Sequence, residues 1–132
     1  MTPLDEWVRC KQWIADGLAF AGGLYNIEDI ERSIEAGDMI FLPAEHCAVV
    51  LEFNIYPNAK VLSVFSGGGE TGLALKEYAE TVDPFITNFA KLHGCKFVMH
   101  HCRLSGERVG RSLGYKKLWS VMCKEVIQGD VS

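Results

Sequence analysis

The sequence lacks three features that would assign it to a class at once: a long apolar run, a basic excess and paired cysteines. No apolar stretch approaches the roughly 20 residues of a membrane-spanning helix, so we expect no membrane partner. The 17 acidic residues outnumber the 13 basic ones. We therefore expect no nucleic-acid partner, because neutralising phosphates takes a basic surface. Five widely spaced cysteines without a C-x-x-C pair are typical of buried thiols in a reducing cytosol.

The remaining composition is that of one ordinary globular domain. Of the 132 residues, 48% are hydrophobic and 23% are charged, so neither disorder nor a coiled coil is indicated. We treat residues 1–132 as a single domain. The first six residues, MTPLDE, have neither the basic start nor the apolar stretch of a signal peptide. A cytoplasmic protein is therefore expected.

Helical spacing predicts two helices at the beginning of the chain. Thr2 suits an N-cap and Pro3 suits the first helical position. The first helix should end at Gly22 and Gly23, and its apolar stripe consists of Leu4, Trp7, Val8, Ile14, Ala15 and Leu18. A second helix is expected over 27–36, capped by Asn26 and stopped by Gly37.

The middle of the chain changes to strand patterns. Three β-rich runs, 39–42, 47–55 and 60–65, predict an antiparallel meander, with turn residues at 56–59. Gly67, Gly68 and Gly69 then end the third strand abruptly.

Helical spacing returns after the glycines. We expect helical pieces over 73–79 and 83–92, the second beginning at a fresh cap formed by Asp83 and Pro84. A strand over 96–102, a short helix over 106–113 with Gly114 as C-cap, and a final strand over 115–126 complete the chain. The predicted fold class is mixed α/β, with order α-α-β-β-β-α-β-α-β around a central mixed, largely antiparallel sheet.

The junction from strand to helix at 61–74 is the most informative feature. Glycines there expose backbone N–H groups at the beginning of a helix, where the helix dipole favours an anion such as a pyrophosphate. Any sharp turn after a strand also needs glycine, so the pattern alone admits a purely structural interpretation. Glu70 opposes the anion, since its carboxylate occupies the same electrostatic position.

The order of elements and the tail motifs resemble the GNAT acyltransferase superfamily. Residues 90–96, AKLHGCK, resemble its A-x-x-x-G-C step from helix to strand, and Leu113-Gly114-Tyr115 resembles the end of its short last helix. Within the superfamily, the pattern resembles that of small GNAT-like proteins of tailed bacteriophages. In these proteins a glycine-rich turn, a Pro-interrupted helix, the Gly-Cys step and a final strand containing Lys-Glu, here Lys124-Glu125, recur together. The resemblance covers residues 27–126 and implies the GNAT fold, acetyl-CoA as acyl donor and an amine as acceptor.

The resemblance also implies which residues hold the donor. Its acyl-CoA loop reads Q/R-x-x-G-x-G/A, and with Gly69 as the first motif glycine, Ser66 takes the basic position and Thr71 that of the second glycine. Many members use a tyrosine four residues before the final Gly-Phe as a general acid, a position that is Gly110 here. The cofactor-binding residues implied are Ser66, Gly67, Gly68, Gly69, Thr71, Gly72 and Arg108.

Three other features allow two interpretations each. Glu52, in the middle of an apolar run, could be the base that deprotonates an amine, or an exposed position of an alternating strand. His100 and Cys102 could share one face of a strand and bind zinc together with His46 and Cys47, but we expect no metal. A basic group could contact CoA phosphates or an acidic partner, or be solvated; it consists of Arg103, Arg108, Arg111, Lys116 and Lys117.

Two functions follow from the resemblance. The first is an N-acetyltransferase that moves an acetyl group from acetyl-CoA to an amine, with Glu52 or a bound water as the base. The alternative is a catalytically silent GNAT-like bacteriophage protein, acting in virion assembly or host interaction through a phage or host protein partner and found in the host cytoplasm or the virion. A homodimer is compatible with both functions. A third hypothesis is a metal-binding regulatory protein.

Overall fold

The computed structural model describes residues 2–19, 23–101 and 107–129. Helix α1 (Pro3–Leu18) begins as predicted: the Thr2 hydroxyl accepts from the Asp5 N–H, and the Asp5 carboxylate accepts from the Thr2 N–H. Asn26 and Asp29 form the same capping box at helix α2 (Ile27–Glu35). Gly37 follows α2 with a φ of 81°, which confirms the predicted stop.

Four strands form one sheet in the order β1-β2-β3-β4. Strands β1 (Ile40–Pro43), β2 (Cys47–Tyr56) and β3 (Ala59–Gly69) make the predicted antiparallel meander, and β4 (Phe97–His100) lies parallel to β3. The register shifts by one residue where Val50 pairs with Ser66 and Leu51 with Val64, so Phe65 is the extra residue of a β-bulge.

The helical segment after β3 is continuous, which corrects the expected fresh start at Asp83. Helix α3 (Ala74–Glu77) runs through a π-helical segment, η1 (Tyr78–Val82), into α4 (Asp83–Leu92). Asp83 itself has helical dihedral angles and is 92% buried. Gly94 ends α4 with a φ of 71°, and Gly114 follows α5 (Glu107–Ser112) with a φ of 92°; both stops were predicted.

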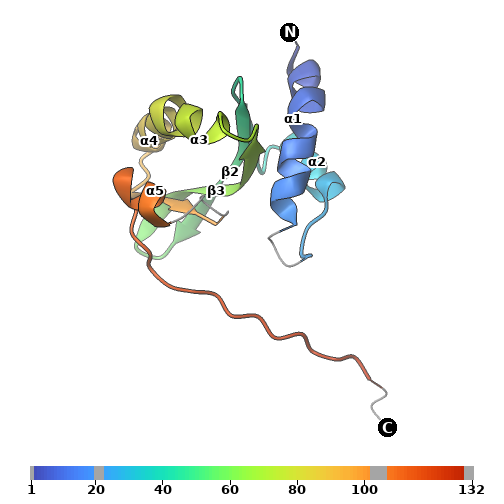
Figure 1. The fold of residues 1–132 in the computed structure, drawn as a ribbon. Coiled ribbons are helices and arrows are strands. Elements are labelled where there is room, and N and C mark those ends of the chain that lie inside the picture. The colour runs from blue at the N-terminus through green and yellow to red at the C-terminus, as the bar shows by residue number, and fades with distance from the viewer. Residues whose placement is uncertain (1, 20–22, 102–106, 130–132) are drawn as a thin grey trace.

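Helices cover both faces of the sheet (Figure 1). On one face, α1 and α2 pack over a cluster that includes Cys10, Ile14, Ile30 and Val50. On the other face, η1 and α4 cover a cluster built on Leu51, Leu62, Val64, Tyr78, Val82 and Ile86. The sheet is therefore the middle layer of three, as an α/β chain with apolar strands requires.

Two expectations about apolar residues are wrong. The buried line on α1 is Cys10, Ile14 and Leu18, whereas Leu4 and Val8 are 70% and 68% exposed because they lie on the flank of that face. Cys123 is exposed, unlike the buried Cys10 and Cys47. Cys102 lies outside the described residues. Within the described part of the chain, no helix is both long and apolar enough to cross a membrane.

The predicted final strand over 115–126 is also wrong in this structure. Residues 115–129 have no regular secondary structure and extend away from the body (Figure 1). The segment has the residue types of a strand, but no strand among the described residues forms a hydrogen-bond ladder with it. Strand residues without a neighbouring strand cannot satisfy a hydrogen-bond ladder, which is why the sequence pattern alone misled here.

Candidate functional site

The three glycines belong to β3 and do not end it, which corrects the expected strand over 60–65. Gly67, Gly68 and Gly69 pair with Val49, Ala48 and Cys47 of β2. The turn into the helix comes later, at residues 70–73, so the strand continues four residues beyond the predicted end.

Close packing explains why these positions are glycine. A Cβ on Gly68 would stand 2.4 Å from the carbonyl oxygen of Trp13 in α1, and one on Gly69 would stand 2.4 Å from the carbonyl oxygen of His46. Gly17 of α1 is equally tight, 2.4 Å from the carbonyl oxygen of Gly67. The glycines let α1 and the β2 backbone approach β3 more closely than any side chain allows.

The same stretch of β3 also offers a free edge. Glu70 N–H donates to His46 O at 2.8 Å, so alternation along the ladder directs the peptide groups of Gly67 and Gly69 away from β2. On that side the ladder with β4 ends at Val64 and His100, followed by a bond from His101 N–H to Val64 O at 3.0 Å. Beyond this point, none of the described residues pairs with β3, and the two strands part at the bulge.

The turn itself is exposed and tightly folded. Leu73 N–H and Ala74 N–H both donate to Glu70 O, at 3.2 and 2.9 Å, and Gly72 has a φ of 84° that favours glycine. Thr71 and Gly72 are exposed, and a Cβ on Gly72 would meet no atom within 4 Å. Between β3 and the helix there is thus an open turn, reached by solvent.

Carboxylates gather around this turn. The His46 ring lies between Glu70 Oε2, 3.1 Å from its Nδ1, and Glu45 Oε1, 3.6 Å from its Nε2. Glu77 Oε1 accepts from His46 N–H at 2.7 Å and from the Cys47 thiol at 3.3 Å. Glu70 belongs to the turn itself, so the cluster places negative charge there.

These contacts shift two pKa values. Burial raises the pKa of Cys47 to about 12, with the Glu77 carboxylate acting in the same direction. For Glu77, burial acts to raise the pKa, but the hydrogen bonds from His46 N–H and the Cys47 thiol outweigh it and lower the pKa. One ligand atom each from Glu45, His46 and Glu77 lie within 4.8 Å of one another, a spacing that a divalent cation could use.

The structure does not bring the predicted base to the turn. Glu52 is half-buried on β2 opposite Ser63, five residues from Cys47, and therefore roughly 16 Å along the strand from the turn. Alternation places it on the α1 and α2 face of the sheet, with Ala48 and Val50. Ser66 is buried and its hydroxyl has no hydrogen-bond partner among the described residues, while Arg108 is exposed on α5.

Sequence reasoning missed a second polar cluster, behind β4. Tyr78 OH lies 2.7 Å from His100 Nε2, the Tyr115 ring contacts the His100 ring at 4.6 Å, and Tyr115 OH donates to Asp83 Oδ1 at 2.6 Å. Burial lowers the pKa of His100 to about 4. His100 is engaged with Tyr78 and Tyr115, and the Cys102 of the zinc hypothesis is not described. The feature of the sequence that could have indicated this cluster is Tyr115, which directly follows Gly114 at the end of a helix.

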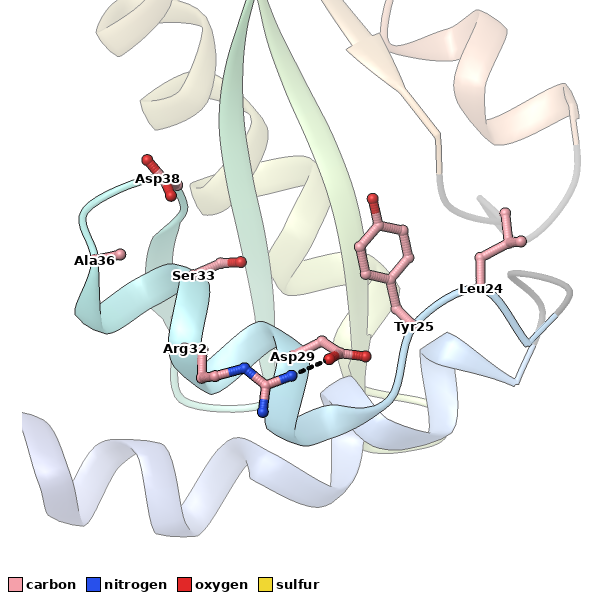
Figure 2. Close-up of a pocket in the computed structure, with 7 residues that line it drawn as sticks. All are labelled: Leu24, Tyr25, Asp29, Arg32, Ser33, Ala36 and Asp38. Atoms are coloured by element: carbon pink, nitrogen blue, oxygen red, sulfur yellow. Dashed lines mark hydrogen bonds and ion pairs between the residues drawn. The ribbon is translucent and has the colours of Figure 1, made fainter.

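An open depression of about 440 Å³ lies beside α2 rather than at the turn. Figure 2 shows Asp29 and Arg32 paired on α2, with Asp38 across the rim and Tyr25 rising toward β3. Tyr25 contacts the bulge residue Phe65 edge to face, with ring centroids 4.8 Å apart. Tyr25, which lines the depression, therefore connects it to the bulge of β3.

Several solved structures that superpose on this chain are described as acetyltransferases. A "possible acetyltransferase" from Clostridium difficile 630 superposes with a TM-score of 0.65 at 10% identity, covering 96% of this chain and 95% of that one. The chain has the GNAT fold. A GNAT family acetyltransferase of Staphylococcus aureus gives 0.59 at 14% identity, covering 96% and 95%. Glucosamine-6-phosphate N-acetyltransferase of Arabidopsis thaliana gives 0.58 at 16%, covering 84% and 87%. No family model and no curated protein matches.

The observed position of the turn changes how the loop pattern of the resemblance described above aligns with this chain. The observed turn contains Gly72, and with Gly72 as the first motif glycine, Ala74 occupies the Gly/Ala position and Gly69 the Gln/Arg position. The alignment on Gly69 used above placed the motif inside a strand. The basic side chain is missing in either alignment, and Gly110, at the position of the tyrosine, is buried in α5.

Proposed function

We propose that the chain is an acyl-CoA-dependent N-acyltransferase that transfers an acetyl group to an amine. The observation that carries this proposal is the free edge of β3 at Gly67 and Gly69, followed at once by the open turn at Thr71 and Gly72, in a GNAT fold. An extended amide-containing ligand can hydrogen-bond to a free strand edge, and a pyrophosphate can accept from N–H groups of a turn that begins a helix.

Each predicted residue has a role in this proposal. The peptide groups of Gly67 and Gly69 bind the pantetheine amides, and those of Thr71 and Gly72 bind the pyrophosphate. Gly68 and Ser66 act through packing, since a side chain on Gly68 would collide with Trp13 and Ser66 is buried. Arg108 is proposed to contact the phosphate of the adenosine end. The geometry of β3 and its turn supports this proposed donor site.

The acceptor is proposed to enter from the depression beside α2. Asp29 and Asp38 on its rim, against the single cation Arg32, give it a net negative charge that suits an amine, which is protonated in water. The protonated amine loses one proton to a base, and its nitrogen attacks the thioester carbonyl to form the C–N bond. The nitrogen then loses its second proton to water, the C–S bond breaks, and CoA leaves as a thiolate that takes up a proton from water. Glu52 lies on the same face of the sheet as α2 and is the proposed base, directly or through a water.

Two observations favour the catalytically silent alternative. Three carboxylates, Glu45, Glu70 and Glu77, surround the turn and oppose a pyrophosphate there. Gly110 in place of the tyrosine leaves the departing thiolate without that proton donor. None of the solved structures named above is described as a bacteriophage protein, so a phage origin, a virion location and a phage or host partner stay predictions, as does a cytoplasmic location.

Isothermal titration with acetyl-CoA tests the donor site. We expect saturable heat below several hundred micromolar, and a several-fold loss of affinity in Arg108→Gln but not in the control Lys91→Gln, an exposed lysine of α4. Absence of heat would reject the acyltransferase and leave the silent protein. Thiol release with a panel of primary amines then tests catalysis: Glu52→Gln should lower kcat about 100-fold with unchanged acetyl-CoA affinity, whereas Glu35→Gln should change neither.

A further inference from the structure

A histidine and three carboxylates from distant parts of the chain meet beside the open turn. Glu45 and His46 lie in the loop between β1 and β2, Glu70 lies in the turn itself, and Glu77 ends α3. Glu45 Oε1 is 3.6 Å from His46 Nε2, and one ligand atom each from Glu45, His46 and Glu77 lie within 4.8 Å of one another. In the part of the chain that the structure describes, no other three histidine, cysteine or acidic side chains converge in this way. The group therefore offers one nitrogen and two oxygen ligands to a cation.

The spacing and the kind of ligand atom suit a transition-metal ion. Bonds from zinc to nitrogen or oxygen are about 2.0–2.2 Å long, so tetrahedral coordination places two ligand atoms about 3.3–3.6 Å apart. The 3.6 Å between Glu45 and His46 has this value and is too long for a strong hydrogen bond. Glu77 completes the set by a movement of about 1 Å from its place within 4.8 Å. An imidazole nitrogen beside carboxylates favours Zn²⁺ over Mg²⁺, which prefers oxygen ligands alone.

The His46 ring is oriented as a metal ligand would be. Glu70 Oε2 lies 3.1 Å from Nδ1. Because a carboxylate can only accept, this contact assigns the proton of the neutral ring to Nδ1 and leaves the lone pair on Nε2, beside Glu45. A carboxylate that accepts from the second ring nitrogen is the usual support of a metal-bound histidine. Glu70 therefore positions His46 and directs Nε2 toward the proposed ion.

The loop that carries two of the ligands is held by three other elements. Arg9 of α1 donates to Glu45 O at 2.8 Å, and Glu70 N–H of the turn donates to His46 O at 2.8 Å. The Glu77 carboxylate of α3 accepts from His46 N–H at 2.7 Å. Ligands held in place before binding lose little conformational freedom when the ion arrives. This support distinguishes the group from carboxylates that merely share an exposed surface.

We propose that Glu45, His46 and Glu77 bind one divalent transition-metal ion of the zinc class, with Glu70 as the residue that positions His46. The ion reduces the excess negative charge of the three carboxylates, since the guanidinium of Arg9 is already paired with Glu6 at 2.6 Å. The cation site rests on these contacts alone and does not depend on acyl transfer.

The ion also has a role in the acyl-CoA site, and this role rests on the proposed function. Gly69 stands where the loop pattern has Gln or Arg, and Glu70 adds a negative charge next to the proposed pyrophosphate position at Thr71 and Gly72. A divalent ion held at Glu45, His46 and Glu77 replaces repulsion of the phosphates by attraction, and its remaining coordination position can accept a phosphate oxygen. Acetyl-CoA should therefore bind more tightly in the presence of the ion.

Isothermal titration of the full chain with zinc chloride tests the cation site. We expect one Zn²⁺ per chain with a dissociation constant of about 10 µM or below, and no saturable heat with magnesium chloride over the same range. His46→Gln should raise the dissociation constant at least tenfold, whereas His93→Gln, at an exposed histidine after α4, should not change it. Glu77→Gln should also weaken binding, with Glu35→Gln as its control. Equal affinity in the two histidine variants, or no saturable heat with zinc, would overturn the proposal.

A measurement on the unaltered chain removes any doubt about the folding of the variants. Co²⁺ is paramagnetic and accepts the same ligand atoms as zinc. Added below one equivalent to ¹⁵N-labelled protein, it should broaden or shift first the amide signals of Glu45, His46 and Glu77, and leave that of His93 unchanged. Signals affected first around other residues would overturn the site.

Titration of acetyl-CoA with and without zinc then tests the role of the ion. Zinc should raise the affinity several-fold in the unaltered protein and have no effect in His46→Gln. Equal affinities with and without zinc would overturn the role of the ion at the acyl-CoA site. Absence of acetyl-CoA binding under both conditions would reject the acyl-CoA site and this role together, while the zinc and cobalt titrations still decide the cation site.

Discussion

At Gly68, the absence of a side chain leaves room for the carbonyl oxygen of Trp13, 2.4 Å from where a Cβ would stand. Helix α1 lies against β3 because of this contact and the matching one at Gly17. The run of glycines thus has a packing role along its length, and a ligand role is proposed only for the peptide groups that face away from β2. Glycines in a strand indicate that something lies very close to the strand backbone, but the sequence does not show whether it is another element of the protein or a ligand.

Replacing Gly68 tests this packing role. Gly68→Ala should lower the free energy of unfolding by about 1–3 kcal/mol, because backbone of α1 must move away from β3. Chemical denaturation measures the change. Gly129→Ala is the matched control, since a Cβ there meets no atom within 4 Å, and it should be within about 0.5 kcal/mol of the unaltered protein. Equal stability of the two variants would mean that α1 does not contact β3 at Gly68.

Glu70 is the carboxylate of the turn whose removal tests the anion site. It lies 3.1 Å from His46 and 46% of its side chain is exposed. Glu70→Gln keeps the shape and removes the charge that opposes a pyrophosphate, so acetyl-CoA affinity should rise about two- to fivefold at low salt. Isothermal titration measures it, with Glu35→Gln, at the end of α2, as the control. An unchanged affinity would place the pyrophosphate elsewhere.

His100 makes stability depend on pH. Burial, aided by His101, lowers its pKa to about 4, whereas an unfolded histidine titrates near 6.5. Between pH 4 and pH 6.5 the unfolded chain binds more protons than the folded chain, so the free energy of unfolding rises with pH. Above about pH 6.5 His100 no longer changes the free energy of unfolding, because it is then largely neutral in both states. Acidification from pH 6.5 to 4 should cost about 3 kcal/mol through this group. His100→Gln should flatten this dependence, while the exposed His93→Gln should not; a parallel slope in both would contradict the assignment.

At the scale of elements, the helix from Ala74 to Leu92 shows how one proline is accommodated. Pro84 has no N–H, and its ring would meet the carbonyl four residues back in a regular α-helix. The π-helical segment Tyr78–Val82 precedes it, and Asp83 N–H donates to Tyr78 O, five residues back. The extra residue in this turn keeps the helix continuous and directs Tyr78 to His100 and Asp83 to Tyr115.

The bond between Tyr115 and Asp83 joins the end of α5 to the beginning of α4. Tyr115→Phe should lower the free energy of unfolding by about 1–3 kcal/mol, because the buried Asp83 carboxyl loses a hydrogen-bond donor. Chemical denaturation measures it, and Tyr56→Phe, an exposed tyrosine at the end of β2, is the control. If Tyr115→Phe matches that control, α5 is not held by this bond.

Elements specified by local pattern were predictable, and those that depend on distant partners were not. Residues close together in the sequence specify the capping boxes of Thr2 and Asn26 and the helix ends at Gly37, Gly94 and Gly114. They also specify the antiparallel meander. The extension of β3 through Gly69 depends on pairing with β2 and contact with α1, which no local pattern carries. The final strand was predicted from residue types that were present, but its partner was not specified.

The candidate site likewise has a part that local sequence predicts and a part that depends on distant residues. The glycine-rich junction predicted a turn between strand and helix, which the structure has, but the pattern placed that turn at Gly69 instead of Gly72 because the end of the strand depends on its pairing with β2. The carboxylate cluster joins residues 45, 46, 70 and 77, and the His100 cluster joins 78, 83, 100 and 115. Both need the packing of helix against sheet, which spacing in sequence does not reveal.

At the scale of the whole molecule, a three-layer GNAT fold holds a free strand edge and an open turn where β3 leaves β4. The body is acidic, with a balance of −5 over residues 1–115, and three of its carboxylates stand at that turn. In the proposed acyl-CoA site, backbone N–H groups therefore bind the phosphates while the nearby carboxylates repel them. The molecule should bind its donor weakly and more tightly at higher salt, because ions screen the repulsion between the carboxylates and the phosphates.

Amide chemical shifts of ¹⁵N-labelled protein, followed during a titration with acetyl-CoA, test the central claim most directly. The account predicts saturable shifts of the amides of Gly67, Gly69, Thr71 and Gly72, with little change at Gly129, which lies in the C-terminal segment. Saturable shifts confined to other parts of the chain, or none at all, would contradict the donor site at the free edge of β3 and its turn.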